Sequence, residues 1–260
     1  MTYHFYKYQG TGNDFVLFDN RNNKISFTKE QVAFICHRRF GIGADGLMLL
    51  ELQEGYDFKM VYYNSDGNES SMCGNGGRCI TAFAKKLGLV KDKAKFIATD
   101  GEHHATINND LVRLKMNDVN AIEENPDFYF LNTGSPHYVK YVKDVQQFSV
   151  VEEGKKVRYN DRFKAEGTNV NFIENMADSL FVRTYERGVE DETYSCGTGV
   201  TAAALVAAIS GKSTGENTCD IQTLGGKLKI NFQRVSPHHF TDIWLEGPAN
   251  FVFEGDVTIS

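Results

Sequence analysis

The 260-residue sequence lacks the features that would indicate a membrane or nucleic-acid protein. Its longest apolar run, residues 202–209, is far shorter than the roughly 20 residues that a membrane-spanning helix needs. Residues 1–7 alternate like a strand, so no signal peptide is expected. The chain has no long run of Lys or Arg and its net charge is -6, which disfavours a nucleic-acid partner. Its glycine runs match neither of the common phosphate-binding loops, so no nucleotide site is indicated.

Cysteine is scarce as well, with five residues, an odd number, at irregular spacing. A chain of this length can bury a core without disulfides, so we expect reduced thiols and a cytoplasmic location. The spacing of Cys73 and Cys79 fits no zinc knuckle, and no metal site is predicted. A cysteine is most often a small buried apolar residue, and we expect this role for Cys36, Cys79 and Cys219.

The two remaining cysteines lie in two stretches that resemble each other. Residues 63–78 and residues 185–199 each run from a strand-like segment through a polar loop to Cys-Gly-x-Gly, followed by an apolar helical pattern. Cys73 and Cys196 therefore precede helix starts, where unpaired backbone N–H groups and the helix dipole favour a thiolate and bind anions. Two cysteines in matching contexts indicate a pair with one shared task.

Helical patterns and short strands together predict an α+β protein. The helix at residues 201–209 has no polar face beyond Thr201, so it must be buried on all sides. Another helix is expected to start at Thr28, which has capping-box spacing to Gln31. Many short strands are available to enclose the apolar helices. Two of them are expected to form a hairpin through the turn at Gly225.

The fold that we expect has two pseudo-symmetric domains, with the active site in the interdomain cleft. Each domain would be a curved mixed or antiparallel, barrel-like β-sheet wrapped round a central apolar helix. One domain would comprise residues 1–116 joined by a closing strand at 248–260, and the other residues 117–247. Residues 10–16 and 167–173 both place an Asn in a Gly-Thr turn that enters a strand, which we interpret as a second trace of an internal repeat.

Two thiols that face each other across a cleft suit inversion of one carbon centre. A thiolate removes a proton from one face while a thiol delivers a proton to the other, and the pair titrates as a coupled unit. Backbone N–H groups beside Cys73 and Cys196 would hold a substrate carboxylate, which accepts the negative charge that develops. This acid–base chemistry requires no cofactor.

Several motifs in the same order resemble the diaminopimelate epimerase family over essentially the whole chain. These motifs are Gly12-Asn13-Asp14-Phe15, Gly41-Ile42-Gly43-Ala44-Asp45-Gly46, Asn64-Ser65-Asp66-Gly67, Met72-Cys73-Gly74-Asn75-Gly76-Gly77-Arg78, Pro136-His137, Gly167-Thr168-Asn169-Val170-Asn171-Phe172, Glu186-Arg187-Gly188 and Ser195-Cys196-Gly197-Thr198-Gly199. The resemblance implies a homodimeric isomerase, independent of pyridoxal phosphate, that interconverts LL- and meso-diaminopimelate, a small-molecule amino-acid substrate of lysine biosynthesis.

The resemblance also implies roles for individual residues. Cys73 and Cys196 would be the acid and base, with His137 and Glu186 tuning the pKa values of their thiols. The remaining residues would bind substrate: Gly74, Asn75, Gly197 and Thr198 the reacting carboxylate, and Asn13, Asn64, Asn169, Glu186 and Arg187 the rest of the molecule. The adjacent Glu186 and Arg187 suit the distal zwitterion of diaminopimelate, which needs an anionic and a cationic partner together.

The sequence departs from the family pattern at a few positions. Ser135 stands where the family usually has Asn before Pro-His, which alters one expected substrate hydrogen bond. Gly46 replaces a side chain found in some members, and Phe253 stands where a Tyr is common in the closing strand. The acidic segment 190–192 adds a residue between Glu186 and Cys196, which we interpret as a loop insertion.

Two other functions fit parts of the pattern. A related two-cysteine proline or hydroxyproline racemase or epimerase would share the chemistry but would not need the Glu186-Arg187 pair. A non-catalytic anion- or metal-binding module could use the glycine-rich helix starts and the cysteines. Stoichiometric zinc without exchange of a substrate α-hydrogen would favour this second alternative.

Overall fold

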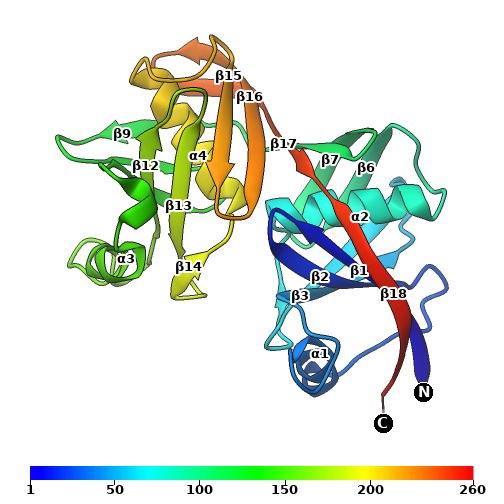
Figure 1. Ribbon diagram of the computed structural model, residues 1–260. Helices are drawn as coiled ribbons and strands as arrows, with labels where there is room; N and C mark the ends of the chain where they lie inside the picture. The colour runs from blue at the N-terminus through cyan, green and yellow to red at the C-terminus, as the bar shows by residue number, and fades with distance from the viewer. Residues whose placement is uncertain (260) are drawn as a thin grey trace. The chain divides into compact units, whose positions relative to one another are not determined.

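The computed structural model describes residues 1–259, which divide into two compact units. Unit 1 comprises residues 1–114 and the described residues from 248 onward, and unit 2 comprises residues 115–247. The predicted α+β class is confirmed, because both units combine strands with helices (Figure 1). No helix within residues 1–259 is both long and apolar enough to cross a bilayer.

The elements of unit 1 are mostly strands. They are β1 (Thr2–Gly10), β2 (Asn13–Asp19), α1 (Lys29–Cys36), β3 (Gly46–Glu51), β4 (Phe58–Asn64), β5 (Glu69–Ser70), α2 (Gly74–Lys86), β6 (Lys93–Ala98), β7 (Gly101–Asn108), β8 (Leu111–Lys115) and β18 (Asn250–Thr258). Strands β1 and β2 pair antiparallel, β2 and β3 parallel, β3 and β4 antiparallel, and β4 and β6 parallel. The β6–β7–β8 meander follows, and β18 pairs antiparallel with β1 along nearly its whole length.

Unit 2 repeats this order. Its elements are β9 (Ile122–Glu124), β10 (Tyr129–Asn132), β11 (Pro136–Tyr141), the 3-10 helix η1 (Val145–Gln147), α3 (Val150–Arg158), β12 (Asn169–Asn175), β13 (Leu180–Glu186), β14 (Asp191–Thr193), α4 (Gly197–Ile209), β15 (Thr218–Thr223), β16 (Gly226–Ser236) and β17 (His239–Pro248). The pairings β10–β11 antiparallel, β11–β12 parallel, β12–β13 antiparallel and β13–β15 parallel match those of unit 1 in kind and sequence. The topology is therefore that of an internal duplication.

The two helices that follow Cys-Gly-x-Gly lie at the centre of their units. Every residue of α4 from Gly199 to Ala208 is buried, as its apolar sequence predicts, and strands surround it in Figure 1. Helix α2 buries Gly74 to Thr81 and then one face. Cys73 and Cys196 are the N-caps of α2 and α4, so in both units the chain passes from a polar loop into a buried helix at the cysteine.

The strand order corrects the proposed match between residues 10–16 and residues 167–173. Residues 10–16 lead into β2, the second strand of unit 1, whereas residues 167–173 lead into β12, which takes the place of β3. The echo between them was wrong as an alignment. Topology instead pairs the turn before β2, Thr11-Gly12-Asn13, with the turn before β11, Thr133-Gly134-Ser135. Gly12 and Gly134 have φ angles of 84° and 111°, so both turns need a residue that tolerates the left-handed region.

Two other local predictions concern the start of α1 and the acidic segment 190–192. The capping box of α1 is present, since Thr28 accepts from the backbone of Gln31 and the Gln31 side chain accepts from the Thr28 backbone. The acidic segment 190–192 is not a plain loop insertion. Part of it forms β14, where Glu192 makes an ion pair with Arg183 at 2.6 Å across a hairpin with β13. The cross-strand pair gives the inserted residues a fixed conformation.

Candidate active site

Cys73 lies at the N-terminus of α2 with its sulfur turned back toward the helix. The Cys73 Sγ accepts the backbone N–H of Gly76 at 3.2 Å, which is the geometry of an N-cap side chain. A Cβ on Gly76 would lie 3.1 Å from this sulfur, so the second glycine of Cys-Gly-x-Gly permits the close approach. A sulfur that accepts a backbone N–H at a helix N-terminus is stabilised as thiolate.

A directed chain of hydrogen bonds runs past Cys73. Asn13 Nδ2 donates to the carboxylate of Asp45 at 2.7 Å, and Asn75 Nδ2 donates to Asn13 Oδ1 at 3.3 Å. The Arg78 guanidinium donates to Asn75 Oδ1 at 3.1 Å. A carboxylate only accepts and a guanidinium only donates, so the two charged ends fix the orientation of both amides. Asn13 Oδ1 is thereby held 4.0 Å from the Cys73 sulfur.

Arg78 is a fully buried cation at the base of this chain. Besides Asn75 it donates to the carbonyl oxygens of Gly74 and Pro248 and to the Thr11 hydroxyl. Burial lowers the pKa of Arg78 to about 10, so the side chain stays charged near neutral pH. Its positive charge acts on Cys73 through a low-dielectric interior.

Asp45, at the other end of the chain, belongs to an ion cluster. The Arg38 guanidinium bridges the carboxylates of Asp45 at 2.6 Å and Asp14 at 2.8 Å, and Lys7 pairs with Asp14 at 2.7 Å. Burial opposes ionisation of Asp14, but hydrogen bonds and charge from Arg38 and Lys7 prevail and lower its pKa to about 2. The cluster anchors the loop before β3 against the start of β2, and so holds Asn13.

Cys196, the N-cap of α4, has a different environment. Its side chain makes no N-cap hydrogen bond to the backbone, and its Sγ lies 3.4 Å from the hydroxyl of Thr198. A Cβ on Gly199 would lie 2.5 Å from Asn171 Oδ1, so the second glycine is again required by a close approach. The two helix starts therefore share their backbone plan and differ in the group that meets the sulfur.

His137 is fully buried and neutral. Burial lowers the pKa of its imidazole to about 3, with a smaller contribution from the charge of Arg187. Its Nε2 lies 3.0 Å from the Ser135 hydroxyl, and its Nδ1 lies 3.1 Å from Asn171 Nδ2. The predicted tuning of a thiol by His137 therefore cannot rely on an imidazolium charge near neutral pH.

Asn169 uses its amide to hold the chain around it. Its Nδ2 donates to Ser135 Oγ and to the carbonyl oxygen of Pro136, both at 3.1 Å, and its Oδ1 accepts the backbone N–H of Arg187 at 2.9 Å. The Arg187 side chain donates to the carbonyl oxygen of Glu166 at 2.9 Å. Glu186 accepts the Thr193 hydroxyl at 2.9 Å, which ties it to β14.

The predicted site residues thus gather into two clusters, one in each unit. Asn13, Cys73, Gly74 and Asn75 come together in unit 1, with Asn64 exposed at the end of β4. The unit 2 cluster is formed by His137, Asn169, Glu186, Arg187, Cys196, Gly197 and Thr198. The other cysteines are buried, as expected, and burial raises the pKa of the Cys36 and Cys79 thiols to about 12 and of Cys219 to about 11.

Duplication gives the two clusters an equivalent contact, between the turn before β2 or β11 and the residue two after the cysteine. Asn13 contacts Asn75 in unit 1, and Ser135 contacts Thr198 at 3.2 Å in unit 2. Asp45, the residue before β3, holds Asn13, whereas Ser135 is held by Asn169, the first residue of β12. The strand registers match Asn169 with Gly46, one residue after Asp45, so the two anchors are not equivalent positions. Motif comparison assigned no role to Asp45 or Arg78. Each of them is a charged residue in a motif whose other residues are neutral, and this contrast is the signal by which the sequence could have indicated them.

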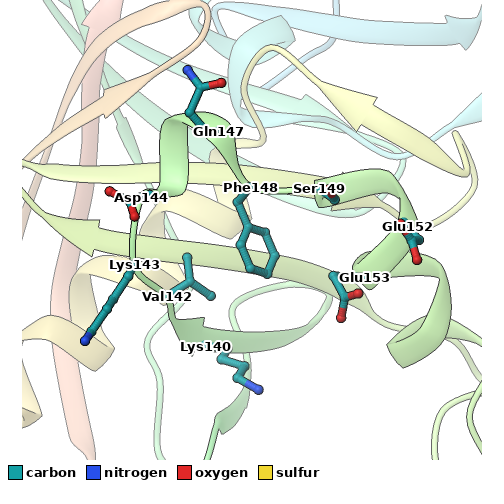
Figure 2. Close-up of a pocket in the computed structure, with 9 residues that line it drawn as sticks. All are labelled: Lys140, Val142, Lys143, Asp144, Gln147, Phe148, Ser149, Glu152 and Glu153. Carbon is teal, nitrogen blue, oxygen red and sulfur yellow. The ribbon is translucent and has the colours of Figure 1, made fainter.

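One surface hollow of about 470 Å³ lies elsewhere on unit 2 (Figure 2). Its lining comes from the end of β11, the η1 segment and the start of α3, with Phe148 in the middle. None of the predicted site residues lines it. Its lysine and glutamate side chains are of mixed sign, and neither Cys73 nor Cys196 is among its lining residues.

Solved structures with the same arrangement define the class of the fold. A PhzF-family phenazine biosynthesis protein from Bacillus anthracis has a TM-score of 0.74 at 14% identity, with complete coverage of both chains. A hydroxyproline epimerase from Agrobacterium vitis has a TM-score of 0.72 at 14% identity, covering 98% of this chain and 92% of that one. The protein has the α+β fold of PhzF proteins and proline racemases.

Sequence relatives are more specific. The sequence model of the diaminopimelate epimerase family matches residues 5–122 and 129–252. A diaminopimelate epimerase from Flavobacterium psychrophilum is 54% identical over 254 residues, covering 96% of this chain and 98% of the relative. One from Chlorobaculum tepidum is 42% identical over 259 residues, covering 96% and 99%. The chain belongs to the diaminopimelate epimerase family, a family of isomerases, which confirms the resemblance seen in the motifs.

Proposed function

We propose that this protein interconverts LL- and meso-diaminopimelate by a two-base mechanism in which Cys73 and Cys196 are the acid and base. One observation carries the proposal. Each unit places a cysteine at the N-cap of a buried helix and surrounds it with an equivalent set of polar residues. Membership of the diaminopimelate epimerase family supports this substrate. Such a duplicated device suits a reaction that treats the two faces of one carbon alike.

In the proposed reaction one cysteine, as thiolate, removes the α-proton of the substrate. The electron pair left on the α-carbon is delocalised into the carboxylate, and the second cysteine donates its S–H proton to the opposite face. Backbone N–H groups at Gly74, Asn75, Gly197 and Thr198 would hold this carboxylate, because the first N–H groups of a helix have no intrahelical partner. Their contribution grows as negative charge develops in the transition state.

The distal zwitterion would be bound by a second set of residues. Glu186 supplies an anion for the distal ammonium group, and Arg187 a cation for the distal carboxylate. The hydrogen bond from the Arg187 backbone N–H to Asn169 fixes the backbone at the end of β13, where Glu186 and Arg187 lie. Asn13 and Asn64 would complete the contacts with neutral amides. A proline substrate has no distal zwitterion, so this pair favours diaminopimelate.

The decisive experiment is incubation of the reduced protein with LL-diaminopimelate in deuterated water. We expect α-deuterium to enter the substrate as the meso form appears. Cys73→Ala and Cys196→Ala should each abolish epimerisation, while Cys219→Ala, a matched change at a buried cysteine, should remain active. Full activity in either of the first two variants would disprove the two-base scheme. Turnover of proline or hydroxyproline in place of diaminopimelate would favour the alternative substrate.

We further propose that the protein is a cytoplasmic homodimer. Reduced cysteines are essential to the scheme above, and a cytoplasm keeps them reduced. Strand β18 exposes Phe251, Val252 and Phe253, an apolar set that a second copy could cover. Sedimentation should show a dimer that Val252→Lys weakens. A monomer at every concentration tested would contradict this assembly.

A further inference from the structure

We propose that Ser135 is a positioning residue, which transmits the fixed orientation of His137 to the Cys196 sulfur through the hydroxyl of Thr198. Ser135 would then hold no substrate atom, unlike the Asn that the family usually carries at this position. The proposal rests on the proposed function for its catalytic meaning. Its geometry stands on hydrogen bonds within unit 2 alone.

The orientation begins at Asn171, whose amide can be assigned from its neighbours. Asn171 Nδ2 lies 2.9 Å from the carbonyl oxygen of Tyr138, which only accepts, so this atom is the NH2 group. The same NH2 group faces Nδ1 of His137 at 3.1 Å. Nδ1 must therefore accept, and the proton of the neutral imidazole is on Nε2. His137 is thus a donor toward Ser135.

Ser135 has one hydrogen and two lone pairs, and the structure gives each of them a partner. The hydroxyl oxygen accepts from His137 Nε2 at 3.0 Å and from Asn169 Nδ2 at 3.1 Å. Because both lone pairs are taken, the hydroxyl hydrogen is left for Thr198 Oγ1 at 3.2 Å. No donor or acceptor capacity of Ser135 is left over for a substrate. This is why we assign it a positioning role.

Thr198 is the last member of this series of hydrogen bonds, next to the Cys196 sulfur. Since Thr198 Oγ1 accepts the hydrogen of Ser135, its own hydrogen is directed elsewhere, and the Cys196 sulfur lies 3.4 Å away. A thiolate only accepts, so in that state the Thr198 hydroxyl donates to it. The result is an O–H aimed at Cys196 from one side and kept there by a chain of fixed donors. Hydrogen bonds to the charged form lower a thiol pKa.

The equivalent position in unit 1 also lies beside its cysteine, which supports the placement of Ser135. In unit 1 the residue at the same place, Asn13, contacts the x residue of Cys-Gly-x-Gly, Asn75, and its carbonyl oxygen approaches the Cys73 sulfur directly. In unit 2 the shorter serine does not contact the sulfur itself, and Thr198 spans the distance. The same scaffold position thus lies beside its own cysteine in both units, with opposite hydrogen-bond sense: Asn13 Oδ1 is an acceptor facing the Cys73 thiol, whereas in unit 2 the Thr198 hydroxyl donates toward the Cys196 thiolate.

The test is the pH dependence of alkylation of the full-length protein by iodoacetamide, followed at each cysteine by peptide mass spectrometry. Iodoacetamide reacts with the thiolate, so the midpoint of the rate profile reports ionisation. In Ser135→Ala we expect the midpoint of Cys196 to rise by about 1 pH unit, since the Thr198 hydroxyl is no longer held toward the sulfur. Cys73, in the same sample, should keep its midpoint, and Ser135→Thr, which keeps the hydroxyl, should restore Cys196.

A second variant and a second measurement guard against loss of folding. Thr198→Val should raise the Cys196 midpoint at least as far as Ser135→Ala does, while Ser210→Ala, a serine-to-alanine change at the far end of α4, should leave it unchanged. Under epimerase assay, Ser135→Ala should lower kcat and leave KM for diaminopimelate unchanged. An unaltered Cys196 midpoint in Ser135→Ala, an equal shift at Cys73, or failure of Ser135→Thr to restore Cys196 would overturn the proposal. These alkylation results do not depend on the substrate, so they separate this proposal from the proposed function.

Discussion

The buried neutral imidazole of His137 makes the stability of unit 2 depend on pH. Folding holds the pKa of His137 at about 3, far below the roughly 6.5 of an exposed histidine. Below about pH 6.5, His137 is therefore protonated in the unfolded chain but stays neutral in the folded protein. The contribution of His137 to stability is complete above about pH 6.5 and is lost progressively as the pH falls toward about 3.

The size of the effect follows from the same shift. Each pH unit inside the window costs about 1.4 kcal/mol, so a fall from about pH 6.5 to about pH 5 should reduce the free energy of unfolding by about 2 kcal/mol through this residue. His137→Gln provides the reference, because a glutamine amide can still donate to Ser135 and accept from Asn171 but does not titrate. The wild type should lose about 2 kcal/mol more than this variant over the same range.

Unfolding of unit 2 can be followed separately. The single tryptophan, Trp244, lies in β17 of unit 2, so its fluorescence during urea denaturation reports this unit. His104→Gln, at a surface histidine paired with Glu102, should behave like the wild type. Equal losses in wild type and His137→Gln would refute the reasoning. So would an NMR titration of the His137 ring with a midpoint near the ordinary value of about 6.5.

Two further changes test the helix starts. Gly199→Ala should lower the free energy of unfolding of unit 2 by about 1–3 kcal/mol, because the new Cβ would meet Asn171 Oδ1 at 2.5 Å. An unchanged urea midpoint would contradict this and show that the Asn171 side chain moves aside without cost. Arg78→Met should destabilise unit 1 by about 3 kcal/mol, because it leaves buried acceptors without a donor. It should also raise the pH at which Cys73 is alkylated while leaving Cys196 unchanged, and equal effects on both cysteines would contradict the assigned role of the Arg78 charge.

Local sequence signals predicted the elements in which one residue pattern decides the outcome. Helix α4 has an apolar residue on every side, so its burial followed from composition, and α1 carried its capping box in Thr28 and Gln31. Helix α3 was not predicted, because its short sequence is rich in charge and has Gly154 in the middle, which disfavours a helix. Tertiary packing reverses that preference: a Cβ on Gly154 would lie 2.5 Å from Tyr185 Cβ, so only glycine lets α3 pack there.

Sequence patterns could propose which residues belong to the candidate site, but not which hydrogen-bond partners these residues have. The cysteines could be found from two copies of Cys-Gly-x-Gly, and the asparagines from family motifs. Which amide faces which partner depends on long-range contacts, such as that between Asn13 and Asp45, and no local pattern encodes them. The turn Thr133-Gly134-Ser135 does echo Thr11-Gly12-Asn13 in the sequence, but only the strand order shows that these two turns are the matching ones.

The pairing of the first strand with the last has a consequence for biosynthesis. Thr2 lies opposite Thr258 in the β1–β18 ladder, and the amino group of Met1 donates to the carbonyl oxygen of Ile259 at 2.7 Å. A ribosome makes all of unit 2 before it makes β18. During translation β1 therefore has one hydrogen-bonding edge without its partner strand until unit 2 has been made, and the sheet of unit 1 is begun before that of unit 2 but completed after it.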